Sequence, residues 1–475
     1  MKTFSQNTSR FVGPLLAIGA LALAASQAFA AGEAKNVILF IGDGMGPVAV
    51  TASRIYKYGE AGSLAMDTMP RAARIKTFSL DAQTTDSAPS MAAYMTGVKM
   101  RNDVISMDGA TITRAPSTDP VTGVSSSINN CPTTGNGAPS PIILEQAIAK
   151  GKAAGVVTTA RLTHATPAAT YAHVCNRDAE YEIARQAVPG GAGYNAALGP
   201  GVDVLLGGIS SYWRPYDAAT RRGRPDGRDL VTELRGMGYS YASDLNSLNA
   251  APATGRLIGL FDQAQSQGHM SYELDRDPAL EPSIAQMTTK AIDILSKNAN
   301  GYFLMVEGGR IDHALHGNNA KRALADTIAF DDAIKAALGK VDLNNTLIVV
   351  TADHDHTMAF NGYSPLGNDI LGKSREVKTK NLQWAADGKP YTTLVFGNGA
   401  TPRNDPATGA RADLTNVDTS VDKNYKQQVA VPLGGSETHG GGDVMLFAAG
   451  AGSKVFKGSL DNTRVFGLMR QAFGF

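Results

Sequence analysis

Acidic and imidazole side chains directly follow an apolar segment in the stretch TLIVVTADHDHT, residues 346–357. The run 346–350 is apolar or β-branched, which predicts a strand buried on both faces. Such strands end where a parallel sheet opens to ligands, and Asp353, His354, Asp355 and His356 come just after that end. Carboxylates and imidazoles together suggest a metal site, whereas the alternative is a polar loop in contact with solvent.

Two further apolar segments are followed by acidic residues. Asp43 follows VILFI, and Glu307 follows YFLMV, with Asp312 and His316 a few residues later. The strand ends of an open α/β sheet share one edge, so these side chains are expected to converge. Carboxylates brought together repel each other, and each must take up a proton or a cation. Mixed imidazole and carboxylate ligands fit zinc, whereas oxygen ligands alone fit magnesium.

The histidines are clustered along the chain. There are eight, and five of them fall in three segments, RIDHALH, ADHDH and SETHGGGD. A single histidine is more often a structural residue than a ligand. Clusters beside aspartates after strand ends favour ligands and the hydrogen-bonding partners of ligands. The five are His313, His316, His354, His356 and His439.

Ser87, in the stretch TTDSAPSMAAYMTG at residues 84–97, is the candidate nucleophile. Pro89 and Gly97 fit the first turn and the C-terminal end of a helix, so Ser87 could simply be its N-cap. A helix N-terminus also stabilises an anionic substrate and an ionised serine. A zinc ion beside Ser87 would lower the pKa of its hydroxyl, so that no histidine base is needed.

Arg177, in the stretch TYAHVCNRD, is a candidate for binding a substrate phosphate. Its planar guanidinium can contact two phosphate oxygens at once. The alternative is a surface side chain, which is the common fate of an isolated arginine.

These residues need a scaffold of alternating strands and helices. Short apolar runs predict strands, and amphipathic patterns over 281–297 and 319–338 predict helices. The predicted fold class is α/β, with a large central, mostly parallel sheet flanked by helices on both faces. Two loop-like segments, about 102–140 and about 358–436, predict lids or surface insertions, and the second contains one strand-like piece, YTTLVFGNG. The predicted strands lie in NVILFIGDGMG, GVVTTARLTHATP, VDVLLGG, YFLMVEGGRID, TLIVVTADHDH and DVMLFAAG.

Length and charge narrow the class of partner. At 475 residues the chain can form one large domain with insertions, or two to three smaller domains. The formal net charge is +1 and no long run carries one sign, which argues against nucleic acid and anionic membrane surfaces as partners. A small-molecule substrate is expected instead.

The N-terminus predicts export from the cytoplasm. Lys2 and Arg10 precede or flank an apolar run over 11–25, and the small residues of AFA at 28–30 suit a signal peptidase. The apolar run falls short of the ~20 residues that a membrane span needs, so residues 1–30 are expected to be a signal peptide. The mature protein would then be periplasmic or secreted, with no membrane span.

The chain has two cysteines, Cys131 and Cys175. Exported compartments allow oxidation, so a disulfide between them is one expectation, and two free thiols are the other. The sequence does not choose between the two.

Taken in order, the motifs resemble those of the alkaline phosphatases. The resemblance runs from about Asn36 to the C-terminus. It implies that residues 31–475 form a single domain with this family's fold and hydrolyse phosphate monoesters through a phosphoserine, at two Zn²⁺ and one Mg²⁺, releasing inorganic phosphate and an alcohol. The motifs are IGDGMG, TDSAPSMAAYMTGVK, THATPAATYAHVCNRD, VEGGRIDHALH, TADHDH and ETHGGGDV.

The resemblance also implies a role for each site residue. Ser87 would be the nucleophile, Arg177 would bind the phosphoryl oxygens, and Asp86 would orient that arginine. The metal ligands would be Asp312, His316 and His439 for one zinc, Asp353, His354 and the bridging Asp43 for the other, and Thr166, Glu307 and Asp43 for magnesium.

Three histidines are expected beside these ligands. Other family members have Asp and Lys where this chain has His164 and His313. Imidazole tolerates zinc better than an oxygen-only set of ligands does, so the metal preference of the third site is open. His356 is expected to be a hydrogen-bonding partner of a ligand.

Further implications concern the surface. The pieces FNGYSPLG, YTTLVFGNG and YKQQVAVPL resemble a crown-like insertion that contributes to a dimer interface in some members, so a homodimer is one expectation. Some relatives hold a Ca²⁺ ion, for which Phe261, Asp262 and Glu281 are the candidates.

Two other classes of function would use the same residues. A phosphodiesterase or sulfatase could be built on the same metals and serine, although TDSAP does not match a sulfatase modification motif. A non-catalytic zinc- or phosphate-binding protein would need the ligands but not the hydroxyl of Ser87. Rates on a phosphate monoester and on the matching diester separate the first alternative, and turnover by the wild type excludes the second.

Overall fold

The computed structural model describes residues 33–261, 268–400 and 408–475. The signal peptide expected at residues 1–30 and the calcium candidate Asp262 therefore lie outside the described residues.

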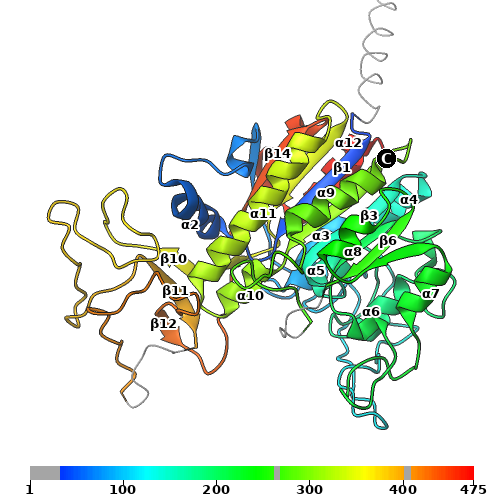
Figure 1. Cartoon of the computed structure of the whole chain (residues 1–475), viewed down its shortest axis with the longest axis horizontal. Helices are drawn as coiled ribbons and strands as arrows, with labels where there is room; N and C mark the ends of the chain where they lie inside the picture. Colours follow the sequence, from blue (N-terminus) through cyan, green and yellow to red (C-terminus); the bar gives the residue numbers. More distant parts are fainter. Residues whose placement is uncertain (1–32, 262–267, 401–407) are drawn as a thin grey trace, which may run out of the picture.

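A ten-stranded sheet runs through the centre of the molecule (Figure 1). Its strands are parallel except β14, which is antiparallel to both of its neighbours. The predicted α/β class with a mostly parallel sheet is confirmed, and each of the six predicted strands is present. The spatial order is β15 (Gly458–Asp461), β2 (Arg71–Lys76), β14 (Val444–Gly450), β8 (Thr346–Thr351), β1 (Asn36–Gly42), β7 (Tyr302–Gly308), β3 (Ala153–Arg161), β4 (Val204–Gly208), β6 (Arg256–Leu260) and β5 (Tyr239–Ala242).

Helices cover both faces of this sheet. On one face, α2, α9, α10 and α11 pack together, with α9 and α11 against the central strands. On the other face, α3, α4, α5 and α12 form the second layer (Figure 1). The helices are α2 (Pro47–Tyr58), α3 (Ser87–Thr96), α4 (Ile143–Ala149), α5 (Ala165–Ala168), α6 (Glu180–Gln186), α7 (Leu230–Gly236), α8 (Leu245–Ala250), α9 (Ile284–Leu295), α10 (Arg310–His316), α11 (Ala320–Lys340) and α12 (Asn462–Phe473), with 3₁₀ turns η1 (Met66–Thr68), η2 (Ala196–Leu198), η3 (Ser211–Trp213) and η4 (Ser453–Val455).

The central strands explain why the acidic residues meet. Every residue of β7 and β8 is buried, as expected for parallel strands covered by helices on both faces. β1 lies between these two strands, and Ile41 pairs with Glu307 of β7 and with Thr351 of β8. Asp43 and Asp353 follow at the ends of β1 and β8, so all three carboxylates lie at one edge of the sheet.

Ser87 is not the N-cap residue of its helix, which was the structural alternative for this serine. Asp86 is the N-cap residue of α3, and Ser87 is its first helical residue. The carboxylate of Asp86 makes no capping hydrogen bond, because it contacts Arg177 and the backbone N–H of Asp103 instead. At the other end, Gly97 has the left-handed conformation (φ 74°) and donates its N–H to the carbonyl of Ala93, as its position predicted.

The two predicted loop segments differ in the structure. Residues 102–140 contain isolated β-bridges but no helix or longer strand. The segment 358–436 contains a three-stranded sheet where the sequence indicated only one strand-like piece, and this sheet lies at the end of the molecule away from α6 and α7 (Figure 1). Its strands are β10 (Met358–Phe360), β11 (Leu394–Gly399) and β12 (Val429–Pro432).

A smaller pairing joins two segments that carry histidines. β9 (Asp355–His356) is antiparallel to β13 (His439–Gly440), and His356 pairs with His439. This pairing brings the segment after β8 beside the segment before β14.

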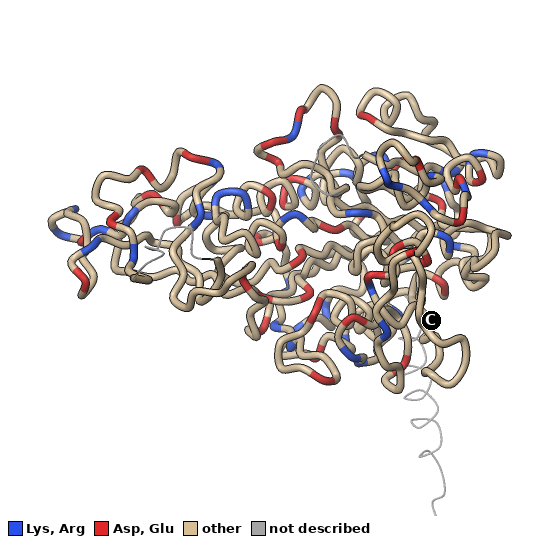
Figure 2. The backbone as a smooth tube through the Cα atoms, turned by 90° about the horizontal axis from the view of Figure 1, so that it is seen from below, with Lys and Arg blue, Asp and Glu red and all other residues tan. Residues whose placement is uncertain are grey.

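Charged residues of both signs are distributed over the described part of the chain. Positions of Lys and Arg are interspersed with positions of Asp and Glu along the backbone, without a large region of one sign (Figure 2). Among the described residues, none of the helices combines the length and the apolar character that crossing a bilayer requires.

The two cysteines form a disulfide, Cys131–Cys175, which decides between the two alternatives that the sequence left open. It attaches the 102–140 segment to the chain just before Arg177. Ile105 and Val174 exchange backbone hydrogen bonds beside it, and the N–H of Arg177 donates to the carbonyl of Asp103 (2.8 Å). The disulfide is thus part of the support of Arg177.

Replacing both cysteines (Cys131→Ser, Cys175→Ser) should lower the free energy of unfolding by about 3–4 kcal/mol, because the bond closes a loop of 44 residues in the unfolded chain. Thermal unfolding with and without a dithiol reductant measures this. The reductant should lower the Tm of the wild type and leave the Tm of the double variant unchanged. Equal Tm values for the oxidised wild type and the double variant would contradict the prediction.

Candidate functional site

Side chains from five separate segments meet at the carboxyl edge of the central strands. Asp43 follows β1, Ser87 begins α3, α10 carries Asp312 and His316, and His439 lies on β13. The His354 Nε2 atom connects them, at 3.3 Å from Asp43 Oδ1, 3.5 Å from Asp353 Oδ2 and 4.0 Å from Asp312 Oδ1. The predicted convergence of the acidic residues and histidines is therefore present in the structure.

Ser87 is buried at the N-terminus of α3, with its hydroxyl facing this cluster. Its Oγ lies 3.1 Å from His354 Nε2 and 3.4 Å from Asp43 Oδ1. The side chain is also next to Asp86, which holds Arg177. A hydroxyl in this position combines a helix N-terminus, a neighbouring carboxylate and a neighbouring imidazole.

Three imidazoles are oriented in the same way by backbone carbonyls. The Nδ1 atom faces the carbonyl of Asp355 in His354 (3.1 Å), of Glu437 in His316 (2.6 Å) and of Thr85 in His439 (2.8 Å). A carbonyl only accepts, so each Nδ1 carries the proton and each Nε2 keeps a lone pair. All three Nε2 atoms point into the cluster, which is the arrangement of histidines that bind a metal.

The lone pairs of two of these imidazoles face each other. His316 Nε2 and His439 Nε2 lie 3.1 Å apart, and they lie 3.3 and 3.4 Å from Asp312 Oδ1. Two lone pairs and a carboxylate oxygen at these distances repel one another unless a proton or a cation lies between them. This group is therefore suited to one cation.

Burial makes the neighbouring carboxylates hard to ionise. Loss of solvation, together with the charge of Asp312, raises the pKa of Asp43 to about 7. Loss of solvation and the charge of Asp43 likewise raise the pKa of Asp353 to about 7. Asp353 Oδ1 accepts from the backbone N–H groups of Gly44 and His354, both at 3.0 Å, which leaves Oδ2 facing the cluster.

A third group lies beside Asp43. Glu307 is fully buried, and its burial and the charge of Asp43 raise its pKa well above the ordinary value. Its Oε2 accepts from the hydroxyl of Thr158. Asp43, Glu307 and His164 lie close enough together to surround one cation, and Thr166 is buried on α5 next to His164. Most of the atoms offered here are oxygens.

His164 connects this third group to Arg177. Its Nε2 accepts from Arg177 Nη2 (3.0 Å), so its proton lies on Nδ1. Burial and the charge of Arg177 lower the pKa of His164 well below the ordinary value, and the ring is neutral. In this arrangement His164 lies between Arg177 and the third group, and its expected role beside the metal ligands stays a prediction.

Arg177 is held in place from several sides. Nη1 contacts Asp86 Oδ1, and the backbone N–H donates to the carbonyl of Asp103. Burial raises the pKa of Asp86, but the charge of Arg177 and the N–H of Asp103 outweigh that effect and lower it overall. Asp86 and Arg177 are therefore in contact with opposite charges, and the orienting role expected of Asp86 stays a prediction.

His313 packs against two other histidines instead of facing the cluster. Its ring lies 4.1 Å from the ring of His269 and 5.4 Å from that of His164, and its Nδ1 lies 3.0 Å from Arg310 Nη1. Burial lowers its pKa to about 3. His269 in turn contacts Arg161 through both ring nitrogens, at 3.1 and 2.6 Å. These rings form a neutral layer behind His164.

His356 differs from the three ligand-like imidazoles. Its Nε2 lies 2.7 Å from Asp312 Oδ1 and its Nδ1 contacts Glu437 Oε2. Although it is close enough to Asp312, His354 and His439 to share a cation with them, neither ring nitrogen has a free lone pair directed there. The expected role of a partner to a ligand fits this geometry.

The unpartnered atoms test whether divalent cations fit these residues. Five buried polar atoms at the site have no hydrogen-bond partner among the described residues. Leaving a buried polar atom unpaired costs about 1–3 kcal/mol, so a group of them indicates a missing partner. Four are oxygens, which suits a cation. The atoms are Asp43 Oδ2, Asp353 Oδ2, Glu307 Oε1, Thr166 Oγ1 and His164 Nδ1.

The residues expected to bind calcium are not assembled in the same way. Glu281 is buried, and both of its carboxylate oxygens accept from Ser271, from the N–H at 2.7 Å and from the hydroxyl at 2.6 Å. Phe261 is fully buried, and Asp262 lies outside the described residues. The calcium site stays a prediction.

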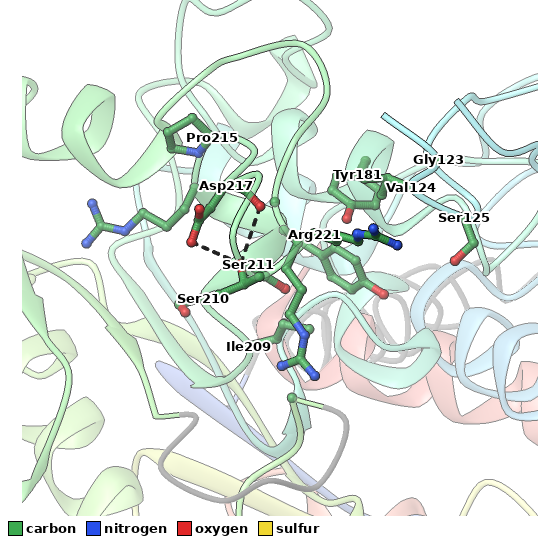
Figure 3. A pocket seen from close by; sticks show the side chains of 16 residues that line it. Gly123, Val124, Ser125, Tyr181, Ile209, Ser210, Ser211, Pro215, Asp217 and Arg221 are labelled. Atoms are coloured by element: carbon green, nitrogen blue, oxygen red, sulfur yellow. Dashed lines mark hydrogen bonds between the residues drawn. The ribbon is translucent and has the colours of Figure 1, made fainter. Parts of the chain in front are cut away.

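A surface cavity of about 870 Å³ lies between the 123–125 loop and the 209–223 segment. Figure 3 shows Tyr181, Ser211, Asp217 and Arg221 around it. None of the predicted site residues is among the described residues that line this cavity, so the polar cluster and not the cavity marks the chemistry.

Some residues at the site were missed by sequence reasoning. Glu437 is two residues from His439 in SETHGGGD, and a carboxylate beside a histidine was an available signal. His269, Arg161 and Thr158 lie in segments without such a signal, because only the fold brings them to His164 and Glu307.

Comparison with known proteins covers nearly the whole chain. A sequence model of the family described as alkaline phosphatase matches residues 34–475. The chain is 38% identical to the alkaline phosphatase of Gadus morhua over 454 residues, which cover 90% of this chain and 89% of that protein. It is 39% identical to the tissue-nonspecific isozyme of alkaline phosphatase of Gallus gallus over 454 residues, which cover 90% of this chain and 82% of that protein.

Solved structures share the fold. The alkaline phosphatase of Thermus thermophilus superposes with a TM-score of 0.65 at 25% identity, covering 93% of this chain and 92% of that chain. The alkaline phosphatase of the Antarctic bacterium TAB5 superposes with a TM-score of 0.62 at 23% identity, covering 93% and 98%. At this level of identity the TAB5 similarity shows the fold alone.

The raised pKa values predict how cation binding depends on pH. In the metal-free protein Asp43 and Asp353 have pKa values of about 7, so each is protonated at lower pH and must release its proton before it can bind a cation. Affinity for Zn²⁺ should therefore rise as the pH increases from about 6 to about 8, with release of protons to the buffer. Isothermal titration of the metal-free protein, in buffers of different ionisation enthalpy, measures both quantities. Affinity that does not change with pH, without proton release, would contradict this.

Proposed function

The chain belongs to the alkaline phosphatase family and hydrolyses phosphate monoesters, and from this we propose that it does so through a phosphoserine on Ser87, at two Zn²⁺ and one Mg²⁺. The observation that carries the proposal is the position of Ser87 Oγ, 3.1 Å from His354 Nε2 at the edge of a cluster of unpaired carboxylate oxygens. A serine hydroxyl with these neighbours suits a nucleophile better than a purely structural residue.

Three groups of residues are proposed to hold the metals. Divalent cations, when bound, supply positive charge that lowers the pKa of a nearby hydroxyl and offsets the charge of the transferring phosphoryl group. The mixed imidazole and carboxylate groups suit zinc, and the oxygen-rich group suits magnesium. The proposed ligands are Asp312, His316 and His439 for one zinc, Asp43, Asp353 and His354 for the other, and Asp43, Glu307 and Thr166 for magnesium.

The reaction would proceed in two displacements at phosphorus. In the first, Ser87 Oγ loses its proton and forms a bond to phosphorus, while the bond to the alcohol oxygen breaks and the alcohol leaves with a proton. In the second, a water oxygen bonds to phosphorus and Ser87 Oγ regains a proton as inorganic phosphate is released. Two in-line displacements give net retention of configuration at phosphorus.

Arg177 is proposed to bind the phosphoryl oxygens during both steps. Its guanidinium keeps its charge: burial lowers its pKa, but the charges of Asp86 and of other nearby carboxylates together outweigh burial and raise it overall. Asp86 occupies Nη1 and the backbone around Asp103 fixes the chain, so the guanidinium is already oriented before substrate binds. Orientation of this kind reduces the entropy lost when the phosphate is bound.

Because the uncatalysed reaction is very slow, catalysis requires both positive charge near the phosphoryl group and fixed orientation of the reacting groups. Enzymes accelerate monoester hydrolysis by up to ~10²¹-fold, which one serine and one imidazole cannot supply alone. A phosphate diester presents one fewer charged oxygen to Arg177 and to the cations. A monoester is therefore the proposed substrate class, and the diester is the discriminating comparison.

Export and dimerisation are proposed on separate grounds. The signal peptide of residues 1–30 is proposed from the sequence alone. A membrane-bound alkaline phosphatase of Bombyx mori is among the relatives, at 36% identity over 92% of this chain.

A homodimer is supported by large apolar side chains exposed on the 358–436 segment, including Tyr363, Leu366 and Trp384. Sedimentation of the mature protein distinguishes a dimer from a monomer.

Replacing Ser87 by alanine should lower kcat/KM for a nitrophenyl phosphate monoester by at least ~10³-fold, because the nucleophile is lost. Zinc content and phosphate affinity should remain close to those of the wild type. Steady-state kinetics, metal analysis and phosphate titration provide the three readouts. The wild type should also hydrolyse the monoester much faster than the matching diester.

Ser53→Ala is a matched control. Ser53 is buried on α2, and its hydroxyl has no hydrogen-bond partner among the described residues, so activity should be retained. A Ser87→Ala protein with wild-type turnover would refute the phosphoserine, and a wild type without turnover would favour a binding protein.

Replacing His164 by aspartate should raise the share of magnesium at the third position relative to zinc. The substitution adds a carboxylate oxygen beside Glu307 and Asp43, and an oxygen set favours magnesium. A histidine-to-glutamate variant of the TAB5 alkaline phosphatase is known with Mg bound in its M3 site. Metal content after dialysis against mixed zinc and magnesium gives the ratio, and a ratio equal to that of the wild type would contradict the expectation.

A further inference from the structure

We propose that Glu437 is a positioning residue that fixes the two imidazoles on either side of Asp312 and thereby the zinc group formed by Asp312, His316 and His439. This inference rests on the proposed function of that group as a zinc site. It assigns a role to a residue that does not itself bind the metal.

Glu437 makes its contacts entirely inside the protein. The residue is 1% exposed, in the segment just before β13. Carboxylate Oε1 accepts from the backbone N–H of Thr357 (2.6 Å) and from the Thr357 hydroxyl. Carboxylate Oε2 accepts from His356 Nδ1. Both oxygens therefore have donors, and the side chain is held in one orientation.

The backbone of the same residue fixes a second histidine. The N–H of Glu437 donates to the carbonyl of His316 (3.0 Å), and its carbonyl accepts from His316 Nδ1 (2.6 Å). The proton of His316 is thereby kept on Nδ1, and the lone pair of Nε2 points towards Asp312 Oδ1 at 3.3 Å. One residue thus determines the tautomer of a ligand and holds the end of α10.

The side chain of Glu437 acts on Asp312 through His356. Carboxylates that are ionised only accept, and His356 lies between two of them, Glu437 at Nδ1 and Asp312 at Nε2 (2.7 Å). The ring therefore donates at both nitrogens. Its donation to Asp312 Oδ1 fixes the carboxylate whose oxygen also faces His316 and His439. The charges alternate in sign from Glu437 to His356 to Asp312.

Glu437 is not itself suited to be a ligand. His316, His356 and Glu437 lie close enough together to surround a cation. The oxygens of Glu437 are already occupied by three donors from Thr357 and His356, and Nδ1 of each histidine is bonded to Glu437 itself. Metal ligands are commonly oriented by carboxylates of this kind, and losing such a carboxylate costs about 10- to 100-fold in metal affinity.

Glu437→Gln tests the proposal because it keeps the shape and removes the charge. The amide can still accept from Thr357, but His356 loses its anionic partner, so Asp312 loses a fixed donor. We expect the affinity for one of the two zinc ions to fall about 10- to 100-fold and the other to stay within about threefold. With zinc in excess, kcat should return to near the wild-type value. Zinc titration of the metal-free protein, followed by metal analysis, provides a readout that does not need turnover.

Glu145→Gln is a matched control. Glu145 is buried and its Oε1 lies 2.7 Å from His173 Nε2, but this pair is remote from the zinc groups in the hydrogen-bond network. Its zinc affinities should equal those of the wild type even if its Tm falls.

If Glu437→Gln does not fold, Thr357→Val provides a second test. It removes one donor to the carboxylate and should lower the affinity for the same zinc ion several-fold.

The outcomes separate this proposal from the proposed function. A wild type that binds no zinc would overturn the zinc assignment itself. A wild type that binds two zinc ions, together with a Glu437→Gln protein of unchanged zinc affinity, would overturn the positioning role alone. Equal losses in Glu437→Gln and Glu145→Gln would show a general effect of destabilisation and would also overturn it.

Discussion

The structure depends on the cost of burying several carboxylates together. Asp43, Asp353 and Glu307 are fully buried at one edge of the sheet, and burial raises the pKa of each. Ionising them all in this environment requires a positive charge of equal strength nearby. Arg177 is paired with Asp86, so the protein itself offers little further cationic charge to these three. Divalent cations, which we propose for this site, would resolve this conflict, and the imidazoles with inward lone pairs would provide further ligands.

Three adjacent strands, the helix α10 and the pairing of β9 with β13 position these groups. β1 lies between β7 and β8, and the register of the sheet places Asp43 level with Asp353 and two residues beyond Glu307. α10 carries Asp312 and His316 one helical turn apart, which puts them on one face of the helix. The pairing of β9 with β13 brings in His439. The disulfide and the backbone hydrogen bonds of Val174 and Arg177 hold the segment that carries Arg177.

Much of this arrangement could be predicted from the sequence because the signals are local. The apolar runs of β1, β7 and β8 are long and end in acidic residues, and α9 and α11 have clear amphipathic faces with capping residues Ser283 and Asn319. β2 was missed because its sequence RAARIK carries three basic residues and only two of its six positions are buried. β5, β6 and β15 are four or five residues long, which gives a weak periodic signal. The sheet in 358–436 was also missed, since its strands are short and separated by long loops.

The partners of the site residues were harder to predict than the residues themselves. Glu437, Thr357 and His269 act through contacts between segments far apart in the chain, which only the tertiary structure defines.

The proposed site requires that its carboxylates and imidazoles surround bound cations. Diffraction from crystals of the purified protein at the zinc absorption edge tests it most directly. Two anomalous peaks ~4 Å apart are expected, among Asp43, Asp312, Asp353 and the three inward-facing imidazoles. A well-ordered site from zinc-supplemented protein with no peak there would contradict it.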